Sequence, residues 1–220
     1  MAGKVPSRAE LAKYSVNRPG WEAIRQSLYD FQTYNAAGHS TLSFFTTPVG
    51  GTKTLSDTNM TLAGQLPTNQ EFLIQSIEIK FLTTTPAPSS STEAAAVAAP
   101  VLATQINDSY LVSRTGNLTL TIGSKAYLQE GPLGRFPPKT TFAVDAALAL
   151  ATTVAADGIE AKIAVPRWEG RPYLIAPAEL WLISNQNFNV SLNWPEGVQA
   201  ITNDARIGVI MDGILYRRSQ

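Results

Sequence analysis

In one stretch of the chain, apolar and polar residues alternate and the alternation changes phase once. Phe72 and Ile74 share one parity, whereas Ile77 and Ile79 share the other. Because successive side chains of a strand point to opposite faces, both pairs reach the same core only if the strand holds one extra residue. The pattern therefore predicts a β-strand with a bulge at residues 75–76.

Alternation with a period of two recurs in many short segments, which turn residues such as glycine, proline and asparagine separate. The last segment reads either as one long strand or as a hairpin that turns at Asp212 and Gly213, and residues 140–153 are ambiguous between helix and strand. A count of about eight or nine strands predicts an all-β sandwich or barrel. The predicted strands, besides the bulged one, are residues 39–46, 117–122, 126–129, 159–165, 179–184, 188–194 and 206–217, and two possible short strands are residues 59–63 and 110–112.

Residues 1–35 are predicted to form an N-terminal arm with short helices. Ser7 and Glu10 have the spacing of a capping box, which predicts a first short helix. Up to residue 25 the arm holds five basic and two acidic residues, so it reads either as a solvated tail or as an arm that contacts a partner. Apolar residues at helical spacing predict a second helix that docks on the sandwich: Trp21, Ile24, Leu28 and Phe31.

The rest of the chain, residues 36–220, is predicted to be the sandwich itself, with a low-complexity insertion at residues 83–109. The first part of this insertion is rich in alanine, proline, serine and threonine and has few large apolar side chains. Such a composition predicts an excursion that is partly polyproline-like and partly helical.

Charge and cysteine content exclude several classes of function. Only 15% of the 220 residues are charged, and 17 basic residues balance 17 acidic ones. A nucleic-acid-binding domain is normally visibly basic, so any nucleic-acid contact has to be local. The absence of cysteine excludes disulfides and thiolate chemistry. The sequence also has no apolar run long enough for a transmembrane helix or a signal peptide. Together these two observations predict a chain that folds in a reducing compartment.

No set of residues predicts a catalytic, cofactor-binding or metal site. His39 is the only histidine, so a catalytic triad would have to use it, and phosphate-binding glycine motifs are absent. The acidic residues are scattered, which gives no support to a glycosidase-type carboxylate pair. Four large aromatic residues predict core or interface packing, with a sugar-binding face as the alternative: Trp168, Tyr173, Trp181 and Trp194.

Three features carry a resemblance to a known family: the segment 59–67 running into 72–79, the strands that follow the arm, and the closing segment 208–216. In these features the chain resembles a jelly-roll coat protein of an icosahedral virus, of the tailless-bacteriophage type. The resemblance implies a single jelly-roll β-sandwich of about eight antiparallel strands. It also implies a non-enzymatic structural subunit that assembles into capsomers of an icosahedral shell. After the arm, the chain has room for one jelly roll, which leaves open whether it is a major capsid or a vertex protein.

The resemblance also implies the partners and the location of the protein. The expected partners are copies of itself in trimeric or pentameric capsomers and other capsid proteins, with an internal membrane or the genome as a contact of the arm. No small-molecule substrate and no cofactor are expected, and the location is the virion, after synthesis in the host cytoplasm. The alternative is a carbohydrate- or receptor-binding sandwich, either lectin-like or a phage receptor-binding protein; an enzyme comes third.

Overall fold

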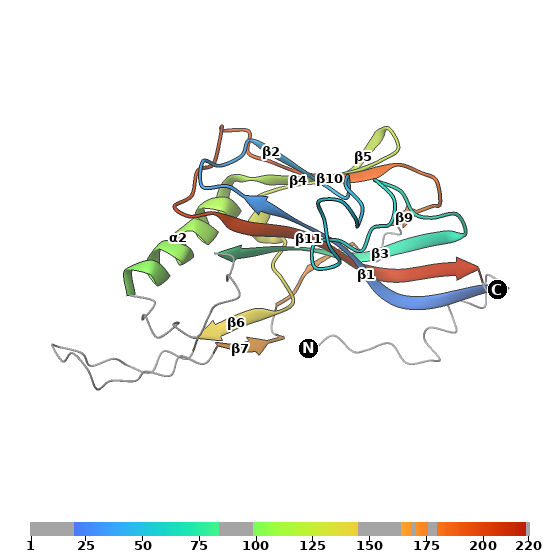
Figure 1. Cartoon of the computed structure of the whole chain (residues 1–220), viewed down its shortest axis with the longest axis horizontal. Coiled ribbons are helices and arrows are strands. Elements are labelled where there is room, and N and C mark those ends of the chain that lie inside the picture. Colours follow the sequence, from blue (N-terminus) through green and yellow to red (C-terminus); the bar gives the residue numbers. More distant parts are fainter. Residues whose placement is uncertain (1–19, 84–98, 145–163, 169, 176–179, 219–220) are drawn as a thin grey trace.

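The structure is a computed structural model, and for part of the described chain it gives the backbone alone. Within the described residues the chain is built mostly of β-strands, which form two sheets and a separate ribbon (Figure 1). The described residues are 20–83, 99–144, 164–168, 170–175 and 180–218, with the backbone alone for 83, 99–106, 141–144 and 164–167.

The first sheet contains three long strands and two short ones. Its order is β1 (Trp21–Tyr34), β11 (Ala205–Arg218), β3 (Gln70–Thr83) and β8 (Tyr173–Leu174). The short strand β9 (Leu180–Leu182) also pairs with β3, beside β8. Every neighbouring pair in this sheet is antiparallel.

The second sheet has four shorter strands, all antiparallel to their neighbours. Its order is β2 (Thr41–Phe44), β10 (Phe188–Asn193), β4 (Asn117–Ile122) and β5 (Lys125–Glu130). The two sheets face each other and enclose the main apolar core (Figure 1).

The strands pair as one long hairpin wrapped around the core. β1 pairs with β11, β2 with β10, β3 with β8 and β9, and β4 with β5, so the pairing is nested from the chain ends inward. Successive members of this nest lie in alternating sheets, which is the strand order of a jelly roll. The predicted all-β, single jelly-roll sandwich is therefore confirmed.

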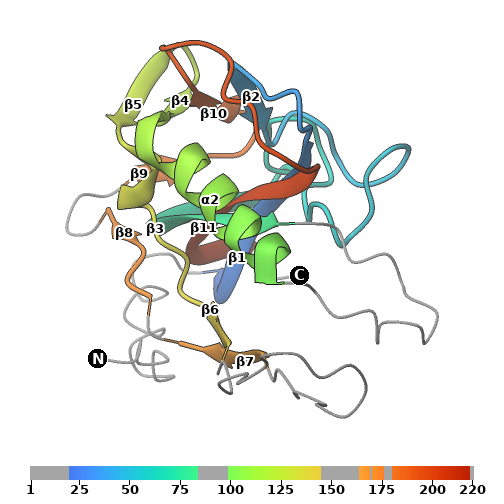
Figure 2. The ribbon, with the colours of Figure 1, turned by 90° about the vertical axis from the view of Figure 1, so that its left-hand side faces the viewer.

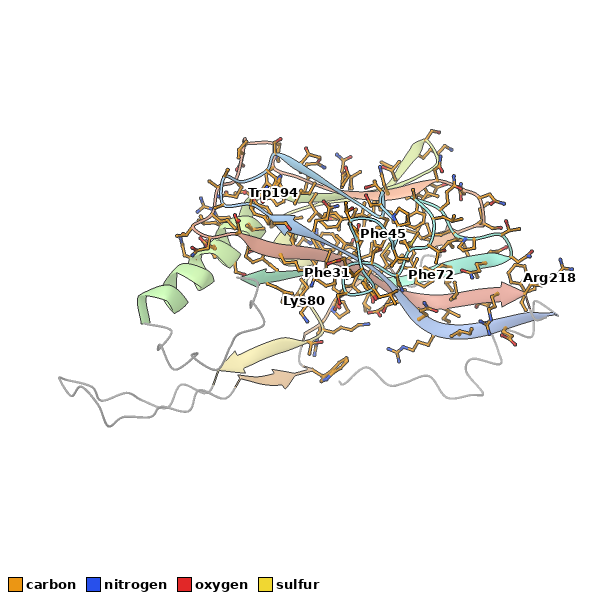
Figure 3. The ribbon with its side chains drawn as sticks, in the orientation of Figure 1. Phe31, Phe45, Phe72, Lys80, Trp194 and Arg218 are labelled. Atoms are coloured by element: carbon orange, nitrogen blue, oxygen red, sulfur yellow. The ribbon has the colours of Figure 1, made fainter. Side chains whose placement is uncertain are left out.

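Side chains from both sheets fill the space between them. Because strand side chains alternate between faces, one parity of each long strand and of β2, β4 and β10 faces this core. Phe45 and Phe72 are both fully buried there (Figure 3). The main buried members from the strands are Phe44, Phe72, Ile74, Ile77, Leu118, Leu120, Ile122, Phe188, Val190, Leu192, Ile207, Val209, Met211 and Leu215.

The predicted bulge of the third strand is confirmed by its pairing with β11. Ser76 lies opposite Asp212, but the next partner of β11, Gly213, lies opposite Ile74. Gln75 is thus the extra residue, and it allows the apolar residues on both sides of it to enter one core. Residues 206–217 accordingly form one long strand and not a hairpin.

The helix predicted over residues 21–31 is wrong, because these residues belong to strand β1. This strand pairs with β11 along its whole length of 14 residues. Two polar residues, Asp30 and Gln32, share the inward parity with the buried Leu28, so the apolar alternation of the strand is interrupted. Phe31 points to the outer face, where a Cβ on Gly208 would overlap its ring. The helix predicted near Ser7 lies outside the described residues.

The insertion ends in helix α2 (Ala99–Thr115), which lies across one end of the sandwich (Figure 2). The possible short strand at residues 110–112 is therefore wrong. Val112 of this helix is buried in the core, and its carbonyl accepts a hydrogen bond of 3.1 Å from the Trp194 indole. The buried Asp108 carboxylate accepts two more bonds of 3.0 Å, from the backbone N–H and the hydroxyl of Thr202. These contacts fix the helix on the sheet ends.

The remaining elements connect the sheets. The segment 59–63, a possible short strand from its sequence, is a loop with one isolated bridge between Leu62 and Gln65. A 3-10 turn, η1 (Leu133–Arg135), follows β5, and a two-stranded ribbon of β6 (Thr141–Val144) and β7 (Ala164–Arg167) lies apart from both sheets (Figure 2). β6 shows strand at the start of residues 140–153, which the sequence left ambiguous, and β7 overlaps the end of the strand predicted at residues 159–165. Residues 145–163, which hold the rest of both predictions, lie outside the described residues.

Candidate interaction surfaces

The outer face of the second sheet is covered by short uncharged polar side chains. Since Leu118, Leu120 and Ile122 of β4 are buried, the residues between them point outward, and the same holds on β10 and β2. The strand registers place these outward residues in adjoining rows. We call this set the polar face: Thr41, Ser43, Asn117, Thr119, Thr121, Gln129, Asn189, Ser191 and Asn193.

The chemistry of the polar face is uniform. Hydroxyl and amide side chains each carry both a donor and an acceptor, so every row can pair with either kind of group on a partner. Asn193 already donates to the Oδ1 of Asn117 at 3.3 Å, across neighbouring strands. Tyr127, the extra residue of β5, is half-exposed beside these rows. The face is suited to contacts that need neither a charge nor a deep pocket.

A buried carboxylate fixes the loop between β2 and β3 on the outer strand of the first sheet. Asp30 of β1 is fully buried, and its Oδ1 lies 2.6 Å from the Nζ of Lys53. Its Oδ2 accepts a hydrogen bond of 2.7 Å from the N–H of Phe45. Phe45 has φ of 66°, a conformation that costs a bulky residue free energy, and this bond helps to hold it there.

The protonation of Asp30 is set by this burial. Burial raises the pKa of the Asp30 carboxyl above its usual 3.8, while the bonds from Lys53 and Phe45 act in the opposite direction. Among the described residues, the groups that bond to the Asp30 carboxylate are Lys53 and Thr58 of the loop and Phe45 at the end of β2. We therefore assign Asp30 and Lys53 a structural role.

The same loop covers part of the open edge of β1. Asp57 accepts from the N–H of Phe31 at 2.7 Å, and Asn59 accepts from the N–H of Tyr29 and donates to the carbonyl of Ser27. Arg206 holds this loop from the side, with its guanidinium 2.5 Å from the Asp57 carboxylate and 4.7 Å from the centre of the Phe31 ring. Covering an edge strand in this way blocks uncontrolled strand pairing.

Two carboxylates that were expected to be scattered meet on the outer face of the first sheet. Glu78 of β3 accepts a hydrogen bond of 2.5 Å from the N–H of Lys139, and the Nζ of Lys139 forms an ion pair with Asp212 of β11. Burial raises the pKa of Glu78, and the nearby Asp212 charge raises it further. Glu78 is only 6% exposed, because the segment before β6 lies over it. This cluster anchors that segment to the sheet.

The residues that sequence analysis singled out do not form one site. His39 lies next to the second sheet, where its ring packs edge-on against Tyr34 and its Nε2 accepts from the N–H of Asn35 at 3.3 Å. Trp194 is buried in the core, whereas Trp168 is 72% exposed. The other two aromatic residues pack on separate neighbours: Tyr173 on Phe136, and Trp181 on Tyr216. The four aromatic residues thus do not share a sugar-binding face.

Among the described residues, no three acidic or histidine side chains come together in a group that could hold a metal ion. In the described part of the chain, no helix has the length and apolar content needed to cross a membrane. A scan against protein-family models and searches of curated proteins and solved structures find no match for this chain.

Proposed function

We propose that this protein is a structural subunit of a viral capsid, which assembles with copies of itself into ring-like capsomers of an icosahedral shell. The observation that carries the proposal is the polar face, a neutral surface displayed by one sheet of a jelly roll. Jelly rolls occur in viral capsid proteins, in lectin domains and in cupins, so the fold alone does not choose among these functions.

The polar face suits repeated contacts between copies of one chain. Burying a charged side chain at an interface costs free energy unless a partner charge meets it, and hydroxyl and amide groups avoid most of that cost. Serine, threonine and asparagine also lose less conformational entropy than lysine, arginine or glutamate when an interface orders them. Their mixed donors and acceptors let one surface meet the surface of another copy without charge matching.

The low charge of the whole chain supports the same proposal. A net charge of zero provides little repulsion between copies, so close packing in a shell carries a small electrostatic cost. It also provides little long-range attraction. Contacts of this kind should therefore survive moderate salt, since screening acts mainly on exposed charges.

Light scattering and negative-stain microscopy of the purified protein test the proposal. We expect trimers, pentamers or closed shells at micromolar concentration, unchanged when salt is raised. A monomer under all these conditions would contradict the capsid function. A monomer that also binds glycans on an array would support the alternative, a carbohydrate- or receptor-binding module, for which the half-exposed Tyr127 beside the polar face is the nearest candidate contact.

A further inference from the structure

The outer edge of strand β1 is only partly covered by the described part of the chain. β1 comes first in the order of the first sheet, and its register with β11 is unbroken from Trp21 to Tyr34 (Figure 1). On the other side of β1, the loop between β2 and β3 bonds to the middle of the strand and stops at Ser27. Residues 22–26 lie before this loop, and we call them the open stretch.

The bonds of the loop show which residues of β1 direct their backbone to the edge. The loop bonds to the N–H of Phe31, to the N–H and carbonyl of Tyr29, and to the carbonyl of Ser27. These are alternate residues, as expected, because in an antiparallel ladder every second residue directs both of its backbone groups to the same side. Since the register with β11 has no shift, Ala23 and Arg25 direct their backbone groups to the edge as well.

The open stretch presents backbone groups that can pair with a further strand. Among the described residues, no hydrogen bond reaches the edge-facing N–H and carbonyl groups of Ala23 and Arg25. Native edge strands are commonly protected from a further strand by a proline, a bulge or a covering loop. The open stretch contains no proline, its register shows no bulge, and the covering loop stops short of it. This edge is therefore built to accept a short partner strand.

We propose that the open stretch of β1 pairs with the open stretch of a second copy of this chain, antiparallel and across a two-fold axis at Ile24. A second copy fits because a two-fold axis brings the same groups together in reverse order. Ala23 of each copy then lies opposite Arg25 of the other, and each of these pairs exchanges two hydrogen bonds. An axis at Arg25 would instead need the carbonyl of Ser27, which the Asn59 amide already holds at 2.7 Å.

The side chains of the open stretch are complementary in this register. Ile24, which is half-buried, meets Ile24 of the second copy in a non-hydrogen-bonded pair, the kind of pair in which side chains approach most closely. Glu22 lies opposite Gln26 of the second copy, so its carboxylate can accept from an amide. An axis at Arg25 would place two like charges opposite each other, and an axis at Ala23 would place Glu22 opposite Ile24. The axis at Ile24 avoids both mismatches.

This contact is separate from the polar face. The edge of β1 belongs to the first sheet and the polar face to the second, so one copy has a different surface for each contact. A closed shell needs at least two kinds of contact between its subunits, since one closed contact alone gives only a ring or a dimer. Pairing of β1 edges would join subunits of neighbouring rings, and only this last step rests on the proposed capsid function.

Because the chain has no cysteine, a single introduced thiol tests the axis. In Ile24→Cys the two thiols meet, since a non-hydrogen-bonded pair has Cα atoms about 4.5 Å apart, within the range that a disulfide spans. The matched control is Gln26→Cys, on the same face and more exposed, whose two copies lie roughly 14 Å apart along the strand. Under mild oxidation with copper phenanthroline, followed on non-reducing gels, we expect Ile24→Cys to form dimers at least about tenfold faster than Gln26→Cys. Random collision would favour the more exposed Gln26→Cys.

A second pair of variants tests the backbone bonds in the Ile24→Cys chain. Arg25→Pro removes an edge-facing donor that makes no bond to β11, so it should slow the cross-link at least about tenfold relative to Arg25→Ala, which keeps the donor. Equal cross-linking rates at residues 24 and 26, or a faster cross-link in Ala23→Cys, would overturn the proposal. Adding Ser191→Arg on the polar face should leave the Ile24→Cys cross-link unchanged. Failure of this pairing and failure of the capsid function are therefore distinguishable.

Discussion

Deletion of Gln75 tests how the sequence sets the register of the sandwich. Without this extra residue, either Phe72 and Ile74 or Ile77 and Ile79 must turn to the outer face of β3. All four side chains are at most 8% exposed, and loss of one such buried side chain costs about 2 to 5 kcal/mol. Displacing two of them would remove most of the roughly 5 to 15 kcal/mol that stabilises a typical domain. We expect the variant to give no soluble folded protein.

The matched control is Gln75→Ala, which keeps the residue count and the bulge. The backbone carbonyl of residue 75 still accepts from the N–H of Ile175, at 3.0 Å in the parent, so the unfolding free energy should change by no more than about 0.5 kcal/mol. Urea unfolding, followed by tryptophan fluorescence, measures both variants. A deletion variant that unfolds at the parent's urea midpoint would refute the claim that this bulge sets the register.

Three further predictions concern buried polar groups. Lys53→Met should lower the unfolding free energy by about 3 kcal/mol near neutral pH, because the fully buried Asp30 loses its partner charge; an unchanged urea midpoint would contradict the structural role of the pair. Glu78 has a pKa raised above 4.5, so it holds its proton more tightly in the folded chain, and its contribution to stability is lost as pH rises through that raised value. Glu78→Gln should therefore flatten the pH dependence of the unfolding free energy above pH 4.5. A steeper pH dependence in this variant would contradict the upward direction of the Glu78 pKa shift. Trp194→Phe leaves the Val112 carbonyl without its donor and should cost about 1 to 3 kcal/mol, with faster amide hydrogen exchange in α2; unaltered exchange there would show that this bond does not hold the helix.

Strands whose inward positions are all apolar could be predicted from sequence. β4 and β10 alternate without exception, and the phase change in β3 located its bulge correctly. β1 could not be predicted in the same way, because its inward positions include Asp30 and its outward positions include Phe31. The resulting spacing of apolar residues mixes two faces of a strand and imitates one face of a helix.

The polar contacts depend on tertiary structure and had no local signal. Asp30 and Lys53 lie 23 residues apart, and Glu78 meets Lys139 across 61 residues. Glu78 does point away from the core, as the alternation of β3 predicts, but the segment that buries it comes from elsewhere in the chain. The polar face, by contrast, had a signal, because the outward positions of β4 and β10 are all serine, threonine or asparagine. Only the order of the strands in the sheet was needed to show that these outward residues form one surface.

Sedimentation velocity on a pair of surface variants tests most directly whether copies of this chain assemble through the polar face, as we propose. Ser191 lies in the middle row of that face, between Ser43 and Thr119. The Ser191→Arg variant places a long charged side chain in the contact, whereas Thr52→Arg places the same side chain on an exposed loop. If the polar face forms the contact between copies, the parent and Thr52→Arg sediment as oligomers or shells, and Ser191→Arg sediments as a folded monomer. A monomeric parent, or a Ser191→Arg variant that assembles like the parent, would contradict the proposal.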